Sequence, residues 1–308
     1  MHKFILRRLL LMLPVLLGVI FVIFSIMWIT PGDPAQIILG EAARPEDIAA
    51  LRLEMGLDDP FMVQFVRFVG QVARFDIGIS FNSRRPAFDE IRDRFPTTIH
   101  LAAITVLLAI AVGIPSGILC AVKHQSIFDN ITSVLGLVML SIPNFWLGLM
   151  LIIFFSVQLG ILPVSGLGTP LHWIMPMLTL GLSASGVYMR FTRSSMLEVI
   201  RQDYIRTARA KGQKESAVIF KHALKNALIP VITVVGLSFG ALLGGAVLTE
   251  TVFAIPGIGS FMVLSIRARD FPVIQGAVLM IAIMFSFINL LVDILYGFVD
   301  PRVRSQYK

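Results

Sequence analysis

Cationic side chains that could bind a partner are concentrated in one polar interval, residues 190–225. The interval holds nine Lys and Arg residues against three acids, an excess of +6 in a chain whose net charge is +7. Ammonium and guanidinium groups bind phosphates and carboxylates. Two interpretations stay open on the residues alone: a docking surface for a partner protein, or an anchor that lies on anionic lipid.

The residue types that perform catalysis are not arranged for it. HExxH, Cys-x-x-Cys, GxSxG and the glycine loops that bind phosphate are all absent. Cys120 is the single cysteine and lies in an apolar run, as a small buried hydrophobe would. The five histidines are scattered: His2, His100, His124, His172 and His222. We therefore expect no catalytic residue, no metal site and no enzyme activity in this chain.

The composition indicates an integral membrane protein. The chain has 308 residues, of which 56% are hydrophobic and 15% charged, whereas soluble domains are about 25% charged. Six apolar segments are each long enough to cross a bilayer at about 1.5 Å per residue. They run over Leu9–Ile29, Ile99–Val122, Ile131–Leu159, Leu171–Met189, Ala227–Leu248 and Val273–Val299. The predicted fold is all-α, a polytopic membrane protein with six transmembrane helices.

The first apolar segment is interpreted as an uncleaved helix rather than a signal peptide. It is longer than the apolar core of a typical signal peptide, and Thr30-Pro-Gly-Asp-Pro34 follows it in place of a small-residue cleavage site. The short basic loops then place both termini and the 190–225 interval in the cytoplasm. The predicted domains are residues 1–30 with the N-terminus and first helix, a segment outside the membrane at 31–96, and a transmembrane core at 97–308.

The 31–96 segment has a polar composition and three predicted helices. Pro45 opens the first and Gly56 ends it. Phenylalanines at helical spacing predict a second from Met62 to Arg74. A third is expected from Phe88 to Arg94, after a break at Pro86. In the third apolar segment, Pro143 frees a backbone carbonyl that neighbours or water must satisfy.

Ionisable side chains are nearly absent from the apolar segments. Asp293, near the end of the sixth, is the exception. Carriers driven by protons or sodium usually need buried carboxylates or other polar sites in the membrane. The scarcity favours an energy source outside the membrane, with Asp293 as a local cap or ion-pair partner.

The basic interval also has a helical pattern. Tyr204 to Lys211 is predicted to be a helix that Gly212 stops. Helix resumes with Ala217, Phe220, Leu224 and Leu228 at helical spacing and continues into the fifth segment. The prediction is a helix-turn-helix at the inner surface.

The same interval resembles the cytoplasmic "EAA" loop of ABC importer permeases. The likeness lies in Tyr204-Ile-Arg-Thr-Ala-Arg-Ala-Lys-Gly212 and in Phe220-Lys-His-Ala-Leu-Lys-Asn-Ala-Leu-Ile-Pro230. Arg206 and Thr207 stand where the general pattern has Glu and Ala, and Lys225 stands where it has Pro. Further similarities to the dipeptide/oligopeptide/nickel subfamily are Pro31-Gly-Asp-Pro34, Asp76-Ile-Gly-Ile-Ser80, Ser141-Ile-Pro-Asn-Phe-Trp146, Arg190-Phe-Thr-Arg-Ser194, Glu250-Thr-Val-Phe-Ala-Ile-Pro-Gly-Ile-Gly259 and Asp300-Pro-Arg302.

The resemblance implies a permease subunit in a bacterial inner membrane that forms half of a pathway for short peptides or related solutes. The implied partners are a second homologous permease, two cytoplasmic ATPases that bind ATP and Mg, and a periplasmic solute-binding protein. No cofactor is expected in this chain. The implied ATPase-coupling residues are Arg206, Thr207, Ala208, Arg209, Ala210, Lys211, Gly212, Lys214, Glu215 and Ser216.

Modest polar groups and a glycine stripe are candidates for the pathway. They are Ser141, Asn144, Ser183, Gly236, Gly240 and Gly244. The glycines fit packing within one bundle and packing against a partner permease equally well. A loop at the outer mouth is expected at Pro256, Gly257 and Gly259. The alternatives to this function are a standalone channel or secondary carrier, and a structural or assembly membrane protein without ATPase docking.

Overall fold

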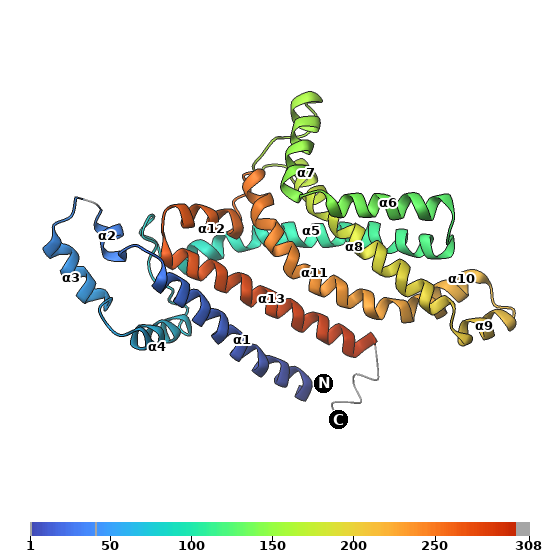
Figure 1. The fold of residues 1–308 in the computed structure, drawn as a ribbon, viewed down its shortest axis with the longest axis horizontal. Coiled ribbons are helices and arrows are strands. Elements are labelled where there is room, and N and C mark those ends of the chain that lie inside the picture. The colour runs from blue at the N-terminus through green and yellow to red at the C-terminus, as the bar shows by residue number, and fades with distance from the viewer. Residues whose placement is uncertain (1, 41, 300–308) are drawn as a thin grey trace. The chain divides into compact units, whose positions relative to one another are not determined.

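The computed structural model describes residues 2–40 and 42–299, and these residues are helical with no strand (Figure 1). One isolated antiparallel bridge, between Ile79 and Pro86, is the sole β-type pairing within them. The all-α prediction is confirmed. The Asp300-Pro-Arg302 motif and the basic tail lie outside the described residues.

The described chain divides into two compact units. The first comprises residues 98–255 and 288–299, together with residues 2–4. It contains most of α5 (Ala87–Val122), then α6 (Ile127–Ser141), α7 (Asn144–Leu151), the π-helix η1 (Ile152–Gln158), the 3-10 helix η2 (Pro170–Trp173), α8 (Ile174–Ile200), α9 (Asp203–Ala210), α10 (Glu215–Ala217), the π-helix η3 (Val218–Ala223), α11 (Leu224–Val252) and the end of α13 (Phe271–Val299).

Helix α8 is the centre of the first unit, where it packs against α6, α7 and α11. Glycines let the helix backbones touch, as in other membrane helix pairs. A Cβ on Gly117 of α5 would lie 2.6 Å from the carbonyl oxygen of Met189. A Cβ on Gly186 of α8 would lie 2.8 Å from the carbonyl oxygen of Gly136 in α6. Around these crossings a buried core forms from Leu101, Met175, Leu180, Tyr188 and Phe253.

The third apolar segment is bent rather than straight. Ile127–Ser141 and Asn144–Gln158 meet at an angle of 100°, and α7 points away from the line of α6 in Figure 1. Ile142 before the proline has ψ 123°, an extended conformation, which fits the steric clash by which a proline ring disfavours helical backbone at the preceding residue. The expected single helix is therefore broken at Pro143, in the geometry of a bent span or of a re-entrant loop.

The second unit comprises residues 5–40, 42–97 and 256–287. It contains α1 (His2–Ile29) from residue 5 on, α2 (Pro34–Leu39), α3 (Pro45–Met55), α4 (Phe61–Val72), the first turns of α5, α12 (Ile258–Arg267) and the first part of α13. The predicted aromatic face of α4 packs on α1: the Phe24 ring lies 5.3 Å from Phe61 and 5.6 Å from Phe68, centroid to centroid.

Two of the three helices predicted in the 31–96 segment are confirmed. Gly56 ends α3 with φ +64°, a left-handed conformation that glycine adopts without strain. The third prediction is wrong, because α5 starts at Ala87 and continues without a break to Val122. Pro96 lies inside it and costs one backbone hydrogen bond, which a helix packed among neighbours tolerates.

Four described helices are long and apolar enough to cross a membrane, and the bent pair makes up to five. The four are Ile5–Ile29, Ala87–Val122, Glu215–Gly244 and Phe271–Ile294. Helix α8, predicted as the fourth span, is not among them by composition. Its second half carries Arg190, Arg193 and Glu198.

Candidate functional site: a basic helical hairpin and the helices that hold it

The predicted helix-turn-helix is present between α8 and α11. Helix α9 covers Asp203–Ala210, and Gly212 follows it with φ +73°. The Gly212 amide donates to the Arg209 carbonyl, and the Lys211 amide donates to the Thr207 carbonyl. The chain thus turns back at a glycine that tolerates the left-handed conformation. We call residues 203–217 the hairpin.

The hairpin rests on an apolar seat. Ile205 and Ala208, three residues apart on α9, are its buried side chains and face the first unit. The seat is formed by Ile118, Ala121, Met196, Val218, Ile219, Ala223 and Ala227. Because α5, α8 and the start of α11 all contribute to it, the hairpin cannot shift without displacing these helices.

Polar contacts fix the hairpin further. Arg209 donates to both carboxylate oxygens of Glu215, at 2.6 and 3.1 Å, and so closes the turn around Gly212. Gln213 Oε1 lies 2.6 Å from His222 Nε2, and Asn226 of α11 donates to the Tyr204 hydroxyl at 2.7 Å. These two contacts join the hairpin to η3 and α11.

The sequence pattern gave the wrong buried face after the turn. Phe220 was expected on the apolar face but is 61% exposed, whereas Val218, Ile219 and Ala223 are buried. The cause is the π-helical η3, whose wider turn shifts the register by a residue relative to an α-helix. Single π-turns often occur at functional sites.

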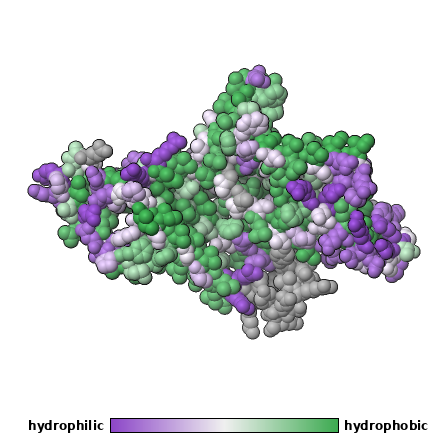
Figure 2. All heavy atoms as spheres, viewed as in Figure 1, coloured by the Kyte–Doolittle hydropathy of each residue, from purple (hydrophilic) through white to green (hydrophobic). Residues whose placement is uncertain are grey.

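The hairpin's outer surface is polar and basic. Of the ten predicted coupling residues, Ala208 is buried in the seat and the others are exposed. The Arg206 side chain is 74% exposed and lies 3.6 Å from exposed Asp203. Figure 2 shows hydrophilic side chains gathered over α9 and α10. The site can therefore bind an acidic partner surface, but its residues have no arrangement for bond-making chemistry.

A buried carboxylate that sequence reasoning missed lies at the start of α6. Asp129 is 1% exposed and receives two hydrogen bonds from Arg193 of α8, at 2.6 and 2.8 Å. The Gln125 amide donates to it as well, at 2.9 Å, and His124 Nδ1 lies 3.3 Å away. We call this group the α6–α8 clamp. Its one signal in the sequence is Arg193, a basic residue four positions after the fourth apolar segment, close enough to the membrane to need a partner.

Other buried carboxylates lie just outside the six predicted apolar segments, within which Asp293 stays the exception. Glu250 at the end of α11 is fully buried and accepts a hydrogen bond from Thr98. In the second unit, Asp270 is 2% exposed and Glu90 is 4% exposed. Asp293 itself is half-buried. Helix termini, rather than the centres of the apolar segments, hold these groups.

The predicted pathway residues are spread over several helices. Ser141 is exposed at the end of α6 and donates to the Leu137 carbonyl. Asn144 starts α7, and Ser183 is half-buried on α8. A Cβ on Gly236 would lie 2.5 Å from Val292 of α13, whereas Gly244 has open space. Gly236 therefore serves packing within the unit, while a route along the other residues stays a prediction.

The predicted outer-mouth residues lie at the start of α12 in the second unit. Gly257 is the N-cap, and both it and Gly259 are buried, while Pro256 is exposed. The Arg94 guanidinium stacks on the ring of Phe261, 3.7 Å from its centroid. Pro256 and Gly257 thus lie in the connection before α12 and Gly259 in its first turn, while their place at an outer mouth stays a prediction.

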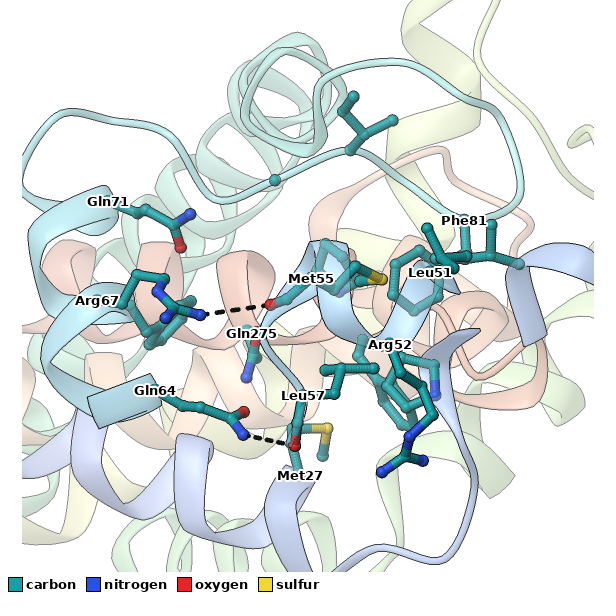
Figure 3. Close-up of a pocket in the computed structure, with 18 of the residues that line it drawn as sticks. Met27, Leu51, Arg52, Met55, Leu57, Gln64, Arg67, Gln71, Phe81 and Gln275 are labelled. Carbon is teal, nitrogen blue, oxygen red and sulfur yellow. Dashed lines mark hydrogen bonds between the residues drawn. The ribbon is translucent and has the colours of Figure 1, made fainter. Parts of the chain in front are cut away.

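The second unit also holds a cavity of about 1280 Å³ (Figure 3). Arg67 donates to the Met55 carbonyl and Gln64 to the Leu57 carbonyl across it. Arg52 is held by Asp33 at 2.8 Å and by Asp58 at 2.7 Å. Hydrogen bonds from Arg52 to Asp58 and Asp33 raise the pKa of Arg52. Arg52 and Arg67, which line this cavity, therefore donate hydrogen bonds to acceptors of the chain itself.

These features define a multi-pass helical membrane protein with an exposed basic hairpin seated on its membrane helices. The chain belongs to the family of binding-protein-dependent transport system inner membrane components. The profile of that family matches residues 113–305, and the profile of its N-terminal membrane component matches residues 1–102.

Curated relatives match over nearly the whole chain. The dipeptide transport system permease proteins DppB of Alkalihalophilus pseudofirmus and Escherichia coli K12 are each 44% identical, over 99% of this chain and 100% of theirs. The glutathione transport system permease protein GsiC of Salmonella paratyphi A is 44% identical over 99% of both chains. An inward-facing structure of the MetNI methionine ABC transporter has the same fold, with a TM-score of 0.55, 19% identity, and coverage of 68% of this chain and 96% of that chain.

The chain is therefore the permease subunit of an ABC importer, a multi-pass protein of the inner membrane. It is not an enzyme, because ATP hydrolysis in such systems is done by separate ATPase subunits.

Proposed function

We propose that this permease forms half of the pathway for short peptides or peptide-like solutes such as glutathione. The support is the 44% identity to dipeptide and glutathione permeases along the whole chain. The full assembly would add a second homologous permease, two cytoplasmic ATPases that bind ATP and Mg, and a periplasmic binding protein. A ligand screen on the binding protein that co-purifies with the chain tests the solute; failure to bind any di- or tripeptide would exclude it.

The proposed topology has six membrane helices with both termini in the cytoplasm. The domains follow from it: residues 1–30 as the N-terminus and first helix, 31–96 in the periplasm, and 97–308 as the permeation core. Helix α8 would be the fourth span despite its two arginines, since Arg193 is paired with Asp129 and long arginines reach toward the interface. The basic hairpin then faces the cytoplasm.

The hairpin is proposed as the coupling element, and its attachment to α11 is the observation that carries this. Tyr204 and Gln213 bond to Asn226 and His222, at or just before the start of α11. Ile205 and Ala208 are buried against the same region. A displacement of the hairpin by an ATPase would therefore move α11 as one body, without a flexible link.

Charge reversal tests this proposal. Arg206→Glu changes an exposed charge without breaking a buried contact, whereas Arg209 also closes the turn through Glu215. For that pair the double swap Arg209→Glu with Glu215→Arg keeps the ion pair and moves the charges. Both changes should abolish ATPase co-purification and transport while expression stays normal. Arg44→Glu, an exposed arginine in the 31–96 segment, is the matched control and should retain both.

If the two hairpin variants keep ATPase association and transport at normal expression, the hairpin does not couple the ATPases to the membrane helices. It would then be an anchor on anionic lipid, the alternative that the sequence left open.

A further inference from the structure

A groove of about 630 Å³ lies between α6 and α8 in the first unit. Its walls are apolar over most of their length, formed by Leu137 and Leu140 of α6 and by Val187 and Phe191 of α8. Leu137 is 54% exposed and Phe191 is 48% exposed. Arg190, Arg193, Ser133 and Ser194 line the groove as well, and all four are polar.

Polarity changes in one direction along the groove. The two helices run antiparallel, so the start of α6 lies beside the later part of α8, as the contact between Asp129 and Arg193 shows. Toward that end the lining carries the two arginines and two serines. Toward the other end it carries Leu137, Leu140 and Val187. A phospholipid has the same sequence of a charged head followed by acyl chains.

The two arginines have different roles. Arg193 is occupied, because Nε and Nη2 both donate to Asp129. Arg190 is exposed and makes no ion pair or hydrogen bond with any residue that the structure describes. It lies ten residues before Ile200, the end of α8, or roughly 15 Å of helix. A guanidinium at that distance from the helix end reaches the headgroup layer by extending its side chain.

We propose that this groove binds one anionic phospholipid of the inner leaflet. Its phosphate would sit on Arg190 with the Ser194 hydroxyl, and an acyl chain would follow Leu137, Leu140, Val187 and Phe191. The charge favours an anionic head over a zwitterionic one, because Asp129 neutralises Arg193 while Arg190 keeps an uncompensated positive charge. The assignment of this lipid to the inner leaflet depends on the proposed topology. The binding of an anionic lipid in the groove does not.

The test counts lipids that stay bound to the full-length chain with its co-purifying subunits. The protein is exchanged into equimolar phosphatidylglycerol and phosphatidylcholine, and retained lipid is measured by native mass spectrometry. Arg190→Gln should lower retained phosphatidylglycerol about fivefold, the factor that corresponds to the loss of one cationic contact near a membrane surface. Arg190→Lys should restore most of it.

Two matched variants separate the site from general surface charge. Arg201→Gln removes an exposed arginine beside the end of α8 that does not line the groove, and it should retain phosphatidylglycerol like the unmodified chain. Leu140→Trp fills the groove and keeps its charges, so it should also reduce retention.

Equal losses in Arg190→Gln and Arg201→Gln would overturn the proposal, since the retained lipid would then be ordinary boundary lipid. The proposal also fails if Leu140→Trp releases the second permease while the lipid count stays constant, because a protein then covers the groove. Neither readout uses ATPase association or transport, so failure here is distinct from failure of the coupling proposal.

Discussion

Arg193 of α8 binds the buried carboxylate of Asp129, at the start of α6, through two hydrogen bonds of 2.6 and 2.8 Å. Ile200, seven residues beyond Arg193, ends α8, and α9 begins three residues later at Asp203. The α6–α8 clamp therefore fixes the helix that leads into the hairpin. A displacement of α9 would therefore act on α8, which the Asp129–Arg193 ion pair already joins to α6.

The α6–α8 clamp should be essential for stability. Asp129→Ala leaves the Arg193 guanidinium without its partner, and breaking such a buried pair costs about 3–5 kcal/mol. Because the Arg193 side chain is 27% exposed, water screens part of the loss and we expect about 3 kcal/mol. Thermal denaturation of the purified complex measures it, in a double-mutant cycle with Arg193→Ala.

The comparison for that cycle is Arg44–Asp47, whose side chains are 75% and 47% exposed. Exposed pairs contribute at most about 1 kcal/mol. If Arg44→Ala lowers stability as much as Asp129→Ala, the clamp has no special role.

Two glycine-to-alanine substitutions should change the stability of the protein in opposite directions. Gly117→Ala places a Cβ 2.6 Å from the Met189 carbonyl oxygen and 2.6 Å from the Thr192 Cβ. Helix α5 must then move away from α8, and such overpacking costs about 1–3 kcal/mol. Gly70→Ala, on the exposed side of α4, meets nothing within 4 Å and should stabilise by roughly 0.5–1 kcal/mol. Unfolding midpoints of the two variants check this, and a gain for Gly117→Ala would show that the helices do not touch there.

In the second unit, Asp270 should hold the loop before α5 in place. It accepts hydrogen bonds from the Ser80 hydroxyl at 2.5 Å, the Phe81 amide at 3.2 Å and the Asn82 amide at 3.3 Å. Asp270→Ala removes all three acceptor contacts, so the loop should open and trypsin should cut faster after Arg84, whereas the Arg85–Pro86 bond resists trypsin in either state. Limited proteolysis followed by mass spectrometry reports the sites.

Asp93→Ala is the control for that experiment. Asp93 lies 3.5 Å from Arg85 but is half exposed, so its loss should leave the cleavage rate unchanged. Equal acceleration in both variants would mean that charge near Arg85, rather than Asp270, protects the loop.

Local signals in the sequence were sufficient for the elements that local interactions specify. Pro45 and Gly56 bounded α3, and Gly212 marked the turn of the hairpin, because each acts through its own backbone. The family resemblance added the importer function. The α6–α8 clamp was out of reach, since Asp129 and Arg193 are 64 positions apart and neither is distinctive alone.

Two further errors came from contacts that override local pattern. A short helix was expected to end at Arg94, but α5 continues past it unbroken to Val122. The π-helical η3 moved Phe220 to the exposed side, which a count of four residues per step could not anticipate. Both depend on packing around the segment rather than on its residues.

The bend at Pro143 has a consequence for the lipid around this protein. Helix α6 has 15 residues, about 22 Å of length, against roughly 30 Å for the hydrocarbon layer. Since α7 departs at 100°, it adds little along the axis of α6. If α6 crosses the bilayer, we expect the lipid beside it to thin to match, at a cost of fractions of a kcal/mol per Å. Transport in reconstituted vesicles should therefore be faster in short-chain than in long-chain phosphatidylcholine, with ATPase association unchanged, so bilayer thickness becomes a determinant of importer activity.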